Sequence, residues 1–586
     1  MDMGAIMKKI WILLIAALIF SASALAGCSN GEEGGEAVKA TMPDQAQALA
    51  FLSMLPENTQ VLVKFESLEK FYENLGVSQN SIMGVALKEK DIRQIQTGLG
   101  FNPLNAQAVK QNGFDLEKPF CLAGANMKVK PEDRQEPAFD GFGLLPVADG
   151  AAAMKTIRSG FEKNDIAFVD AEKDGLRFIQ WDNGIERGCV AVRDQYLYMT
   201  INSQSRPQAF LESIIENDDS LTDAKAFRDI ASDTDLTRDL VVYCNISDMV
   251  EANAKQIEQT AGNHSAQADD ALASLRQYGS AAMTADIGSP DLSVDTTLAL
   301  ADDHEVGKLW SRENVKRDKV LSIAEPAALL LSFGLDVKAY YEMVIEMMPP
   351  APEASAKNRL QAFKEKTGID IETELLDNLN GSLNLGFYDG ASITMFNYNA
   401  LLTAGVKDEK QMTRLIDKAV KLLPPEKQAM ISRQSVGGTE AYVVNPGMIQ
   451  MYAGVDDHKL LLASGKPIFE KALTGDKNEG FVQNLTDERL KERISGRSNI
   501  FYLNMDELLK TVNNFAMFLA EPAGGVQKFK DKLEAAGRFQ YVLASSELDQ
   551  NTIKSLFFVK TRFTQPFFVE LAQMIDQFQP DEKGSN

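Results

Sequence analysis

A repeated order of strand and helix patterns constrains the fold of this 586-residue chain more than any other feature. Residues 55–76 contain an apolar strand, then a polar break at Glu66-Ser67, then a helix with its apolar residues on one face. The same order returns in residues 324–344. Further paired segments follow in matching order and at similar spacing, which chance resemblance does not produce. The sequence therefore predicts two homologous lobes, 45–312 and 315–580.

Several of the paired segments are hairpins. One pair turns at Arg193-Asp194 in the first lobe and at Asp456-Asp457 in the second. Only antiparallel strands can be joined by so short a connection. We therefore expect each lobe to be α+β, with a largely antiparallel sheet and helices packed on one face. Residues 349–358, rich in Pro and charge, are predicted to form a loop.

A second landmark is a Gly, an apolar residue and an Asp, followed by a short polar helix and a strand that contains Gly. It comprises Gly113, Asp115 and Gly124 in the first lobe, and Gly368, Asp370 and Gly381 in the second. The Asp has a structural purpose, because it can cap the short helix. The pattern resembles a bacterial envelope family catalogued only as a domain of unknown function, although Ala123 and Asn380 stand where that family has an aromatic residue. The resemblance implies secretion and internal repetition over residues 45–565, and no activity.

The amino terminus has the layout of a secretory signal peptide. Lys8 and Lys9 precede an uncharged apolar run, Ile10 to Phe20, which is too short to favour a membrane span. The following Leu25-Ala26-Gly27-Cys28 resembles the cleavage site of bacterial lipoproteins. That resemblance implies removal of residues 1–27, lipid on Cys28 and stable attachment to a membrane.

Residues 28–44 are rich in Gly and Glu and lack apolar periodicity, which predicts a flexible acidic tether of roughly 20–25 Å. By the same resemblance, Ser29 after the lipidated cysteine implies sorting to the outer membrane, facing the periplasm. Acidic Glu32, Glu33 and Glu36 leave the cell surface open as an alternative.

Composition excludes some partners and leaves the thiols undecided. A net charge of −23 opposes nucleic-acid binding, and 45% hydrophobic residues indicate a globular chain, long enough to need at least two cores. Cys121, Cys189 and Cys244 each lie in an apolar, strand-like run. They are expected to be buried thiols, with a single disulfide as the alternative.

The sequence contains only weak matches to catalytic and metal-binding motifs. The three histidines, His264, His304 and His458, are dispersed, so no metal site is expected. Ser67 to Lys70 fits S-x-x-K and Lys366 to Gly368 fits K-T-G, two elements of penicillin-binding enzymes, but they fall in different lobes and the second should end a helix. The acidic run at Asp233, Asp235 and Asp239 lacks the Gly and the terminal Glu of a calcium loop.

No catalytic residue, cofactor or metal is therefore assigned. The sequence favours a non-enzymatic envelope protein that binds or scaffolds an envelope partner. A carrier of lipid or another apolar ligand is the alternative, and an unrecognised envelope hydrolase is the third reading. Stretches such as Tyr340 to Met343 and Phe515 to Phe518 fit either an apolar pocket or plain core.

Overall fold

The computed structural model divides the chain into two compact units. Unit 1 takes in the described residues within Thr41–His304 and Phe563–Asn586, and unit 2 those within Glu305–Arg562. The residues that the structure describes are 45–74, 101–102, 105–128, 138–182, 187–202, 207–216, 219–261, 272–301, 323, 326–334, 336–346, 350–390, 399–445, 447, 450–474, 481, 485, 490–491, 499–511, 536–549 and 551–578.

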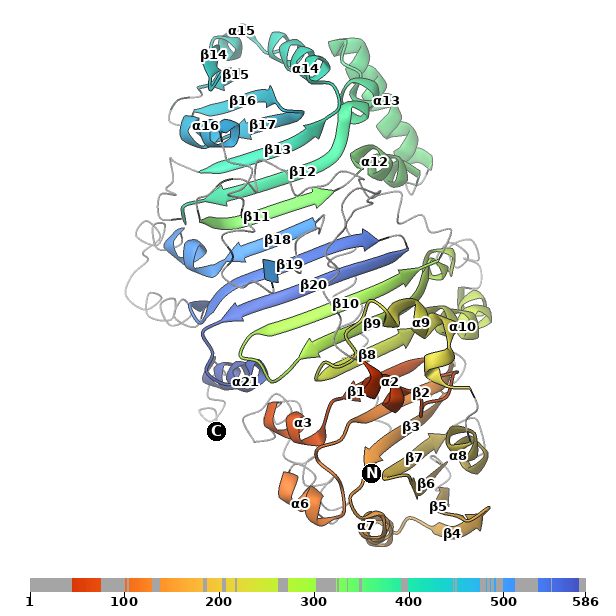
Figure 1. Ribbon diagram of the computed structural model, residues 1–586. Coiled ribbons are helices and arrows are strands. Elements are labelled where there is room, and N and C mark those ends of the chain that lie inside the picture. Colours follow the sequence, from red (N-terminus) through yellow and green to blue (C-terminus); the bar gives the residue numbers. More distant parts are fainter. Residues whose placement is uncertain are drawn as a thin grey trace, which may run out of the picture. The chain divides into compact units, whose positions relative to one another are not determined.

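Unit 1 is built on an antiparallel sheet of ten strands in its described part (Figure 1). The strands pair in the order β10-β9-β8-β1-β2-β3-β7-β6-β5-β4. Their bounds are β1 Val61–Phe65, β2 Phe120–Lys128, β3 Ala138–Pro146, β4 Phe168–Lys173, β5 Leu176–Asp182, β6 Arg187–Arg193, β7 Tyr196–Asn202, β8 Leu240–Asn245, β9 Tyr278–Asp286 and β10 Leu292–Leu300.

Unit 2 contains a sheet with the same plan. Its described strands pair, again antiparallel, in the order β20-β19-β18-β11-β12-β13-β17-β16-β15-β14. Their bounds are β11 Ala327–Gly334, β12 Leu379–Tyr388, β13 Ala400–Val406, β14 Ile431–Val436, β15 Thr439–Val444, β16 Met451–Asp456, β17 Lys459–Ala463, β18 Asn499–Asn504, β19 Phe539–Asp549 and β20 Thr552–Thr561.

The two strand orders become identical when β1 to β10 are matched with β11 to β20 in sequence. The α+β class with a large antiparallel sheet is confirmed, and equal strand order is what a duplication requires; common ancestry of the units stays a prediction. The C-terminal helix α21 (Phe567–Phe578) belongs to unit 1, whereas the predicted second lobe extended to residue 580. The backbone N–H of Phe567 donates to the carbonyl of Ser289, within unit 1.

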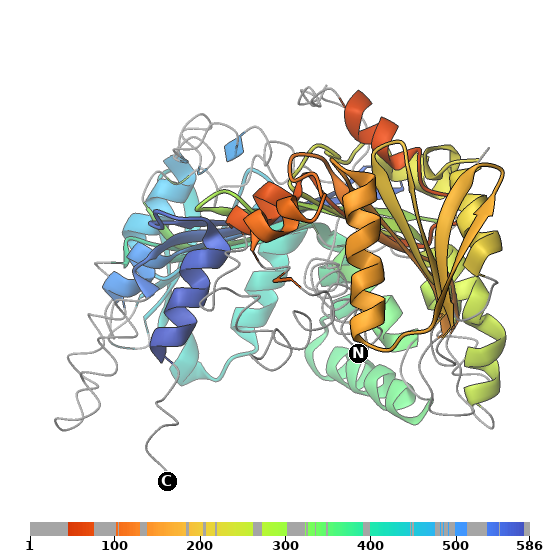
Figure 2. The same ribbon diagram turned by 90° about the horizontal axis from the view of Figure 1, so that it is seen from below.

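Helices of unit 1 lie on both faces of its sheet, so the expectation of a single helical face is wrong there. Helix α7 packs Ala153 against Leu197 of β7, and helix α8 places Leu211 in the cluster that contains Tyr198. Consecutive strand residues point to opposite faces, so the two helices are on opposite sides (Figure 2). The physical reason is that strands such as β8, Leu-Val-Val-Tyr-Cys, are apolar on both sides.

The helical segments of unit 1 have the bounds α2 Ala46–Leu52, α3 Leu68–Asn74, α6 Ala106–Gln111, α7 Gly150–Lys163, α8 Pro207–Ile215, η1 Leu221–Asp223, α9 Lys225–Ala231 and α10 Ile246–Ala261. Those of unit 2 are α12 Val337–Glu346, α13 Pro350–Thr367, η5 Ile371–Leu375, η6 Leu376–Asn378, α14 Glu409–Lys421, α15 Pro425–Gln428 and α16 Lys466–Thr474.

Helix α13 contradicts the predicted loop at 349–358. Pro350 is its first residue, where a proline removes no intrahelical hydrogen bond, and the Ala, Glu and Lys residues that follow favour a helix. The loop prediction was wrong because Pro350 occupies the N-terminal position of the helix, where proline is favourable.

Candidate functional site

The repeated Gly and Asp landmarks serve the backbone. Gly113 has φ +91°, and a Cβ there would lie 2.5 Å from the carbonyl oxygen of Asp149, so only glycine fits. Asp115 Oδ1 accepts a hydrogen bond from the backbone of Glu117 at 3.0 Å. In unit 2, Asp370 Oδ1 accepts from Glu372 at 3.1 Å and from Thr373 at 3.2 Å.

The glycines of the paired strands lie within the sheets. Gly124 is in β2, between Val61 of β1 and Gly141 of β3. Gly381 is in β12 with φ +94°, and Gly368 follows α13 with φ +66°. These glycines shape turns and strands.

Asp370 also forms an ion pair with a lysine. Its Oδ2 lies 2.5 Å from Lys364 Nζ, and this hydrogen bond, with that of the Thr373 backbone, lowers its pKa to about 2. The group is held as a carboxylate that caps η5, which is the role expected from the sequence.

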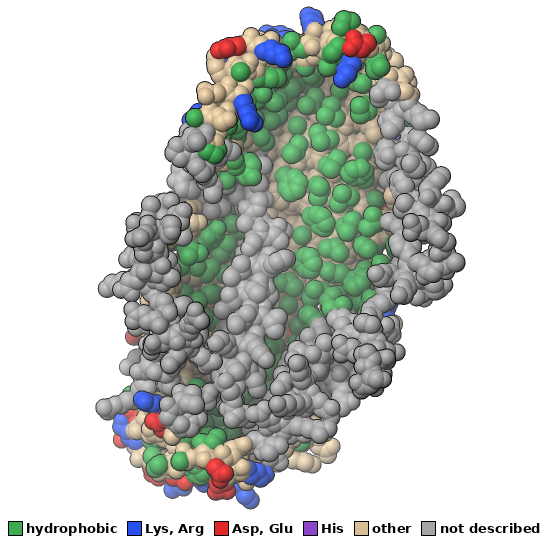
Figure 3. Space-filling view, turned by 180° about the vertical axis from the view of Figure 1, so that it is seen from behind, with side chains coloured by type: hydrophobic (Ala, Val, Ile, Leu, Met, Phe, Trp, Pro, Cys, Tyr) green, Lys and Arg blue, Asp and Glu red, His purple; other side chains and the backbone are tan. Residues whose placement is uncertain are grey.

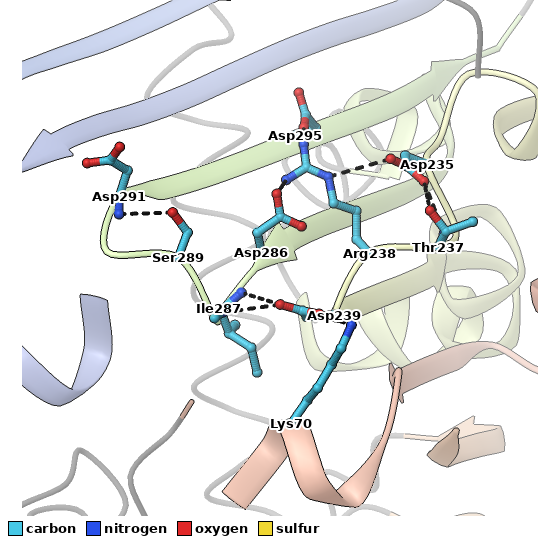
Figure 4. Close-up of polar contacts among 11 residues, drawn as sticks. Lys70, Asp235, Thr237, Arg238, Asp239, Asp286, Ile287, Ser289, Asp291 and Asp295 are labelled. Carbon is cyan, nitrogen blue, oxygen red and sulfur yellow. Dashed lines mark hydrogen bonds and ion pairs between the residues drawn. The ribbon is translucent and has the colours of Figure 1, made fainter. Parts of the chain in front are cut away.

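A nearly buried arginine organises a charged cluster in unit 1 (Figure 4). The Arg238 side chain is 8% exposed, and its Nη1 and Nη2 atoms bind Asp286 Oδ2 at 2.5 Å and Asp295 Oδ2 at 2.6 Å. Asp235 Oδ2 lies 3.7 Å from Arg238 Nε. The guanidinium thus ties the segment before β8 to strands β9 and β10.

A neighbouring carboxylate and lysine extend this cluster to α3. Asp239 Oδ1 accepts from Lys70 Nζ at 2.9 Å, while its Oδ2 accepts from the backbone of Ile287 and Gly288, each at 3.1 Å. Burial alone would lower the pKa of Lys70, but the hydrogen bond to Asp239 and the charges of the nearby carboxylates together raise it. Each carboxylate here has a partner, so the cluster fastens the β9–β10 hairpin to the start of β8.

Lys64 is a second buried cation close to this segment. Its side chain is 1% exposed, and Nζ donates to Glu66 Oε2 at 2.7 Å and to the Leu236 carbonyl at 2.9 Å. A buried ammonium needs such partners. Both donations are internal, so Lys64 is explained as a structural residue.

The hydroxyl groups of the two catalytic motifs considered in the sequence are each hydrogen-bonded to nearby backbone. The Ser67 hydroxyl accepts from the backbone of Lys70 at 3.1 Å, and the Thr367 hydroxyl donates to the carbonyl of Phe363 at the end of α13. His458 lies in the turn between β16 and β17 with φ +55°, and His264 and His304 fall outside the described residues. Within the described part of the chain, no group of three or more His, Cys, Asp and Glu could hold a metal ion.

The three cysteines of unit 1 are free thiols. Cys121 of β2 and Cys189 of β6 are both buried, and the strands β3 and β7 separate them. Burial raises the pKa of each thiol, including that of Cys244, to about 12. The buried-thiol expectation holds for Cys121 and Cys189, whereas Cys244 is half-buried, and none of the three forms a disulfide.

The charged groups described so far have hydrogen-bond partners within the protein. The remaining candidate for a functional site is an apolar face of the unit 2 sheet. Its side chains keep part of their surface exposed, and Leu383, Leu462 and Met451 are 37%, 41% and 46% exposed. We call this surface the open sheet face (Figure 3). It comprises Leu329, Leu331 and Phe333 of β11, Leu383, Leu385 and Phe387 of β12, Leu402 of β13, Met451 of β16, Leu462 of β17, and Phe501 and Leu503 of β18.

Strand register makes the open sheet face continuous. One row of cross-strand partners consists of Phe501, Leu331, Leu385, Leu402 and Leu462, in that order across five strands. A parallel row consists of Leu503, Leu329 and Phe387. Directly opposed side chains lie within contact distance of each other, so each row is an unbroken apolar strip.

The opposite face of the same strands is buried and partly polar. Ser332 Oγ is 2.5 Å from Asn384 Oδ1, and Asn384 Nδ2 donates to Thr403 Oγ1 at 3.2 Å, all three residues being fully buried. The usual arrangement, with polar residues outside, is reversed here. The alternation Leu-Asn-Leu-Gly-Phe in 383–387 is the sequence signal, but alternation alone does not say which face is covered.

Corresponding positions of unit 1 are covered. Val63 of β1 and Val242 of β8 are cross-strand partners and are 3% and 0% exposed, whereas Leu331 and Phe501 at the corresponding places of unit 2 keep part of their surface exposed. The two units therefore share a strand order and differ in the exposure of this face.

A family match places the chain among known sequences. The family described as "Protein of unknown function (DUF3352)" matches residues 144–560. The chain belongs to this family. Membership agrees with the resemblance to a domain of unknown function and carries no activity with it. No curated protein matches the chain.

Among solved structures, this DUF3352 family member is similar to crystal form I of TP0453, at 11% sequence identity and a TM-score of 0.23. The match covers 43% of this chain and 79% of that one. Crystal form III of TP0453 matches at 10% identity and a TM-score of 0.24, covering 43% and 80%. TM-scores this low support no argument about fold or function.

Proposed function

We propose that this DUF3352 protein is an envelope lipoprotein that works by binding and not by catalysis. In this proposal Cys28 carries the lipid anchor, and the body stands in the periplasm on the acidic tether formed by residues 28–44. The Leu25-Ala26-Gly27-Cys28 motif supports the anchor; Cys28 itself lies outside the described residues. None of the described helices is long and apolar enough to span a membrane.

The open sheet face is the observation that supports a binding role. Large contiguous apolar patches on a folded chain mark interaction sites, because water contact with apolar surface is unfavourable. The exposure of Leu383 and Leu462, at 37% and 41%, leaves apolar area for a partner to cover. The buried cations Arg238 and Lys64 support the same choice of surface, because both are bound by internal partners.

Site-specific crosslinking tests this proposal. A photo-crosslinking amino acid replaces Leu462 in one variant and Leu422, which is 46% exposed at the end of α14, in the control. Irradiated envelopes should yield a discrete crosslinked product, protein or lipid, from position 462 and not from position 422. Absence of a product from position 462, and from a second probe at Leu383, would overturn the binding role of this face.

A further inference from the structure

We propose that the open sheet face of unit 2 binds the acyl chains of a membrane phospholipid, laid across the strands. This inference rests on the proposed function and names the chemistry of its partner. It would make the protein a lipid-binding component of the envelope, with the ligand site in the second unit.

The first argument is the match between an uncharged surface and an uncharged ligand. The row through Leu331 and Leu385 continues to Ala453 of β16 on one side and to Ala544 and Phe557 on the other. The eight residues of the row from Ala453 to Phe557 include no charged or hydrogen-bonding side chain, and the partners beyond Ala453 are Tyr442 of β15 and Arg433 of β14. A partner that covers this row finds no polar side chain within it, so the partner must itself be apolar along the same length.

The composition of the face is compatible with an alkyl chain. Protein interfaces concentrate their binding energy in Trp, Tyr and Arg, and Leu is under-represented among such positions. The open sheet face consists of Leu, Phe and Met. These side chains provide dispersion contacts without directional bonds, which is what a flexible hydrocarbon requires.

Dimensions are compatible with this ligand. The row from Ala453 to Phe557 crosses eight strands, which corresponds to about 34 Å at the usual spacing of about 4.8 Å. One leaflet of bilayer hydrocarbon is about 15 Å thick, half of the usual core. One acyl chain therefore fits along a row.

Helix α14 sets one boundary of the site. Its Met412 and Leu415 pack in one cluster with Val406, and Val455 and Leu460 of the same sheet face contact that cluster. The neighbouring row, in which Leu402 and Leu462 are cross-strand partners, lies outside that cluster. A chain would thus lie beside α14, along the row that contains Leu402 and Leu462.

The experiment uses the full-length protein reconstituted in vesicles of phosphatidylethanolamine and phosphatidylglycerol, with a photoreactive group in one acyl chain. After irradiation, the crosslinked peptides are identified by mass spectrometry. We expect label on peptides from β11, β12 and β17. Replacing the two exposed residues together, Leu383→Gln and Leu462→Gln, should lower this labelling roughly tenfold or more, because both side chains lose apolar contact with the ligand.

The control variant is Val169→Gln, which makes a similar change at a residue of β4 that is 67% exposed in unit 1. Its labelling of unit 2 peptides should equal that of the wild type. Circular dichroism of both variants checks that the fold is retained.

Outcomes separate the two proposals. Label confined to residues 28–44, or label on β11 and β12 that the double variant leaves unchanged, overturns acyl-chain binding. If the lipid does not label the face but position 462 still crosslinks a protein in envelopes, the binding role stands and its partner is a protein. If neither probe reports a partner, both proposals are wrong.

Discussion

Arg238 shows how a single side chain holds distant segments of unit 1 together. Its two hydrogen-bonded carboxylates, Asp286 and Asp295, are on β9 and β10, and the Arg238 side chain is 8% exposed. Removing one member of a buried ion pair leaves the other charges without compensation. The charged cluster should therefore respond to the loss of the guanidinium more strongly than a surface pair does.

We predict that Arg238→Met lowers the free energy of unfolding by roughly 2–4 kcal/mol, somewhat less than a fully buried pair because Asp286 is 45% exposed. Denaturant unfolding followed by circular dichroism measures the change. The control is Arg177→Met. The Arg177 guanidinium is 85% exposed beside Glu172, so its removal should change the free energy of unfolding by less than about 0.5 kcal/mol. Equal effects of the two substitutions would contradict the proposed role of the cluster.

The thiols give a prediction about reactivity. Burial raises the pKa of Cys121, Cys189 and Cys244 to about 12, so almost no thiolate exists near neutral pH. Folded protein should therefore react with iodoacetamide at about pH 8 at least roughly a hundredfold more slowly than protein unfolded in guanidinium. Mass spectrometry counts the modified residues. Rapid modification of all three in the folded protein would show that the cores of unit 1 open readily.

Some of these residue roles could be read from the sequence and some could not. The capping function of Asp115 and Asp370 is local, since the donors lie within three residues of each carboxylate. Arg238 binds carboxylates 48 and 57 residues away, and that pairing depends on the register of β8, β9 and β10. Sequence spacing contains no such information.

At the scale of elements, the cap of η5 couples a short helix to pH. The Lys364 ammonium and the Thr373 backbone hold the pKa of Asp370 at about 2, below the ordinary 3.8. A depressed pKa means that the folded state favours the carboxylate, so the contribution to stability is complete above about pH 4 and is lost as pH falls through about 2.

We predict that Asp370→Asn destabilises the protein at neutral pH and that the difference from the wild type shrinks as pH falls from about 4 toward 2. Urea unfolding at a series of pH values provides the measurement. Lys364→Gln should reproduce part of the effect, because it removes the largest cause of the depressed pKa. A difference that stays constant down to the lowest pH would show that the cap acts without its charge.

The sequence pattern alone could not predict the open sheet face. Alternation in 383–387 correctly separates Leu383, Leu385 and Phe387 from Asn384 and Gly386. Apolar residues are normally assigned to the interior, yet here Asn384 is buried and Leu383 is exposed. The three-residue network of Ser332, Asn384 and Thr403 makes this reversal tolerable, because it satisfies amide and hydroxyl groups inside the sheet.

At the scale of the whole molecule, the repeated order of segments predicted more than any motif did. The hairpin turns at Asp194 and Asp457 both have positive φ and lie at corresponding places in the two strand orders. The position of α21 was not predictable in this way, because Ser289 of unit 1 provides its backbone contact. A repeat predicts what each unit contains and not which unit takes the final helix.

Attachment of the molecule to a membrane depends on one residue in the proposal. Cys28 is the acceptor of the lipid, and several acyl chains bind a bilayer strongly because each buried methylene contributes about 0.8 kcal/mol. We predict that Cys28→Ala moves the protein from the membrane pellet to the soluble fraction, or leaves an uncleaved precursor. Ser29→Ala is the matched control and should stay in the pellet in processed form. Fractionation, with the mass of the mature amino terminus, distinguishes these results. A processed Cys28→Ala protein that still pellets completely would mean that a contact other than the lipid attaches the molecule to the membrane. The open sheet face would then be the first surface to test.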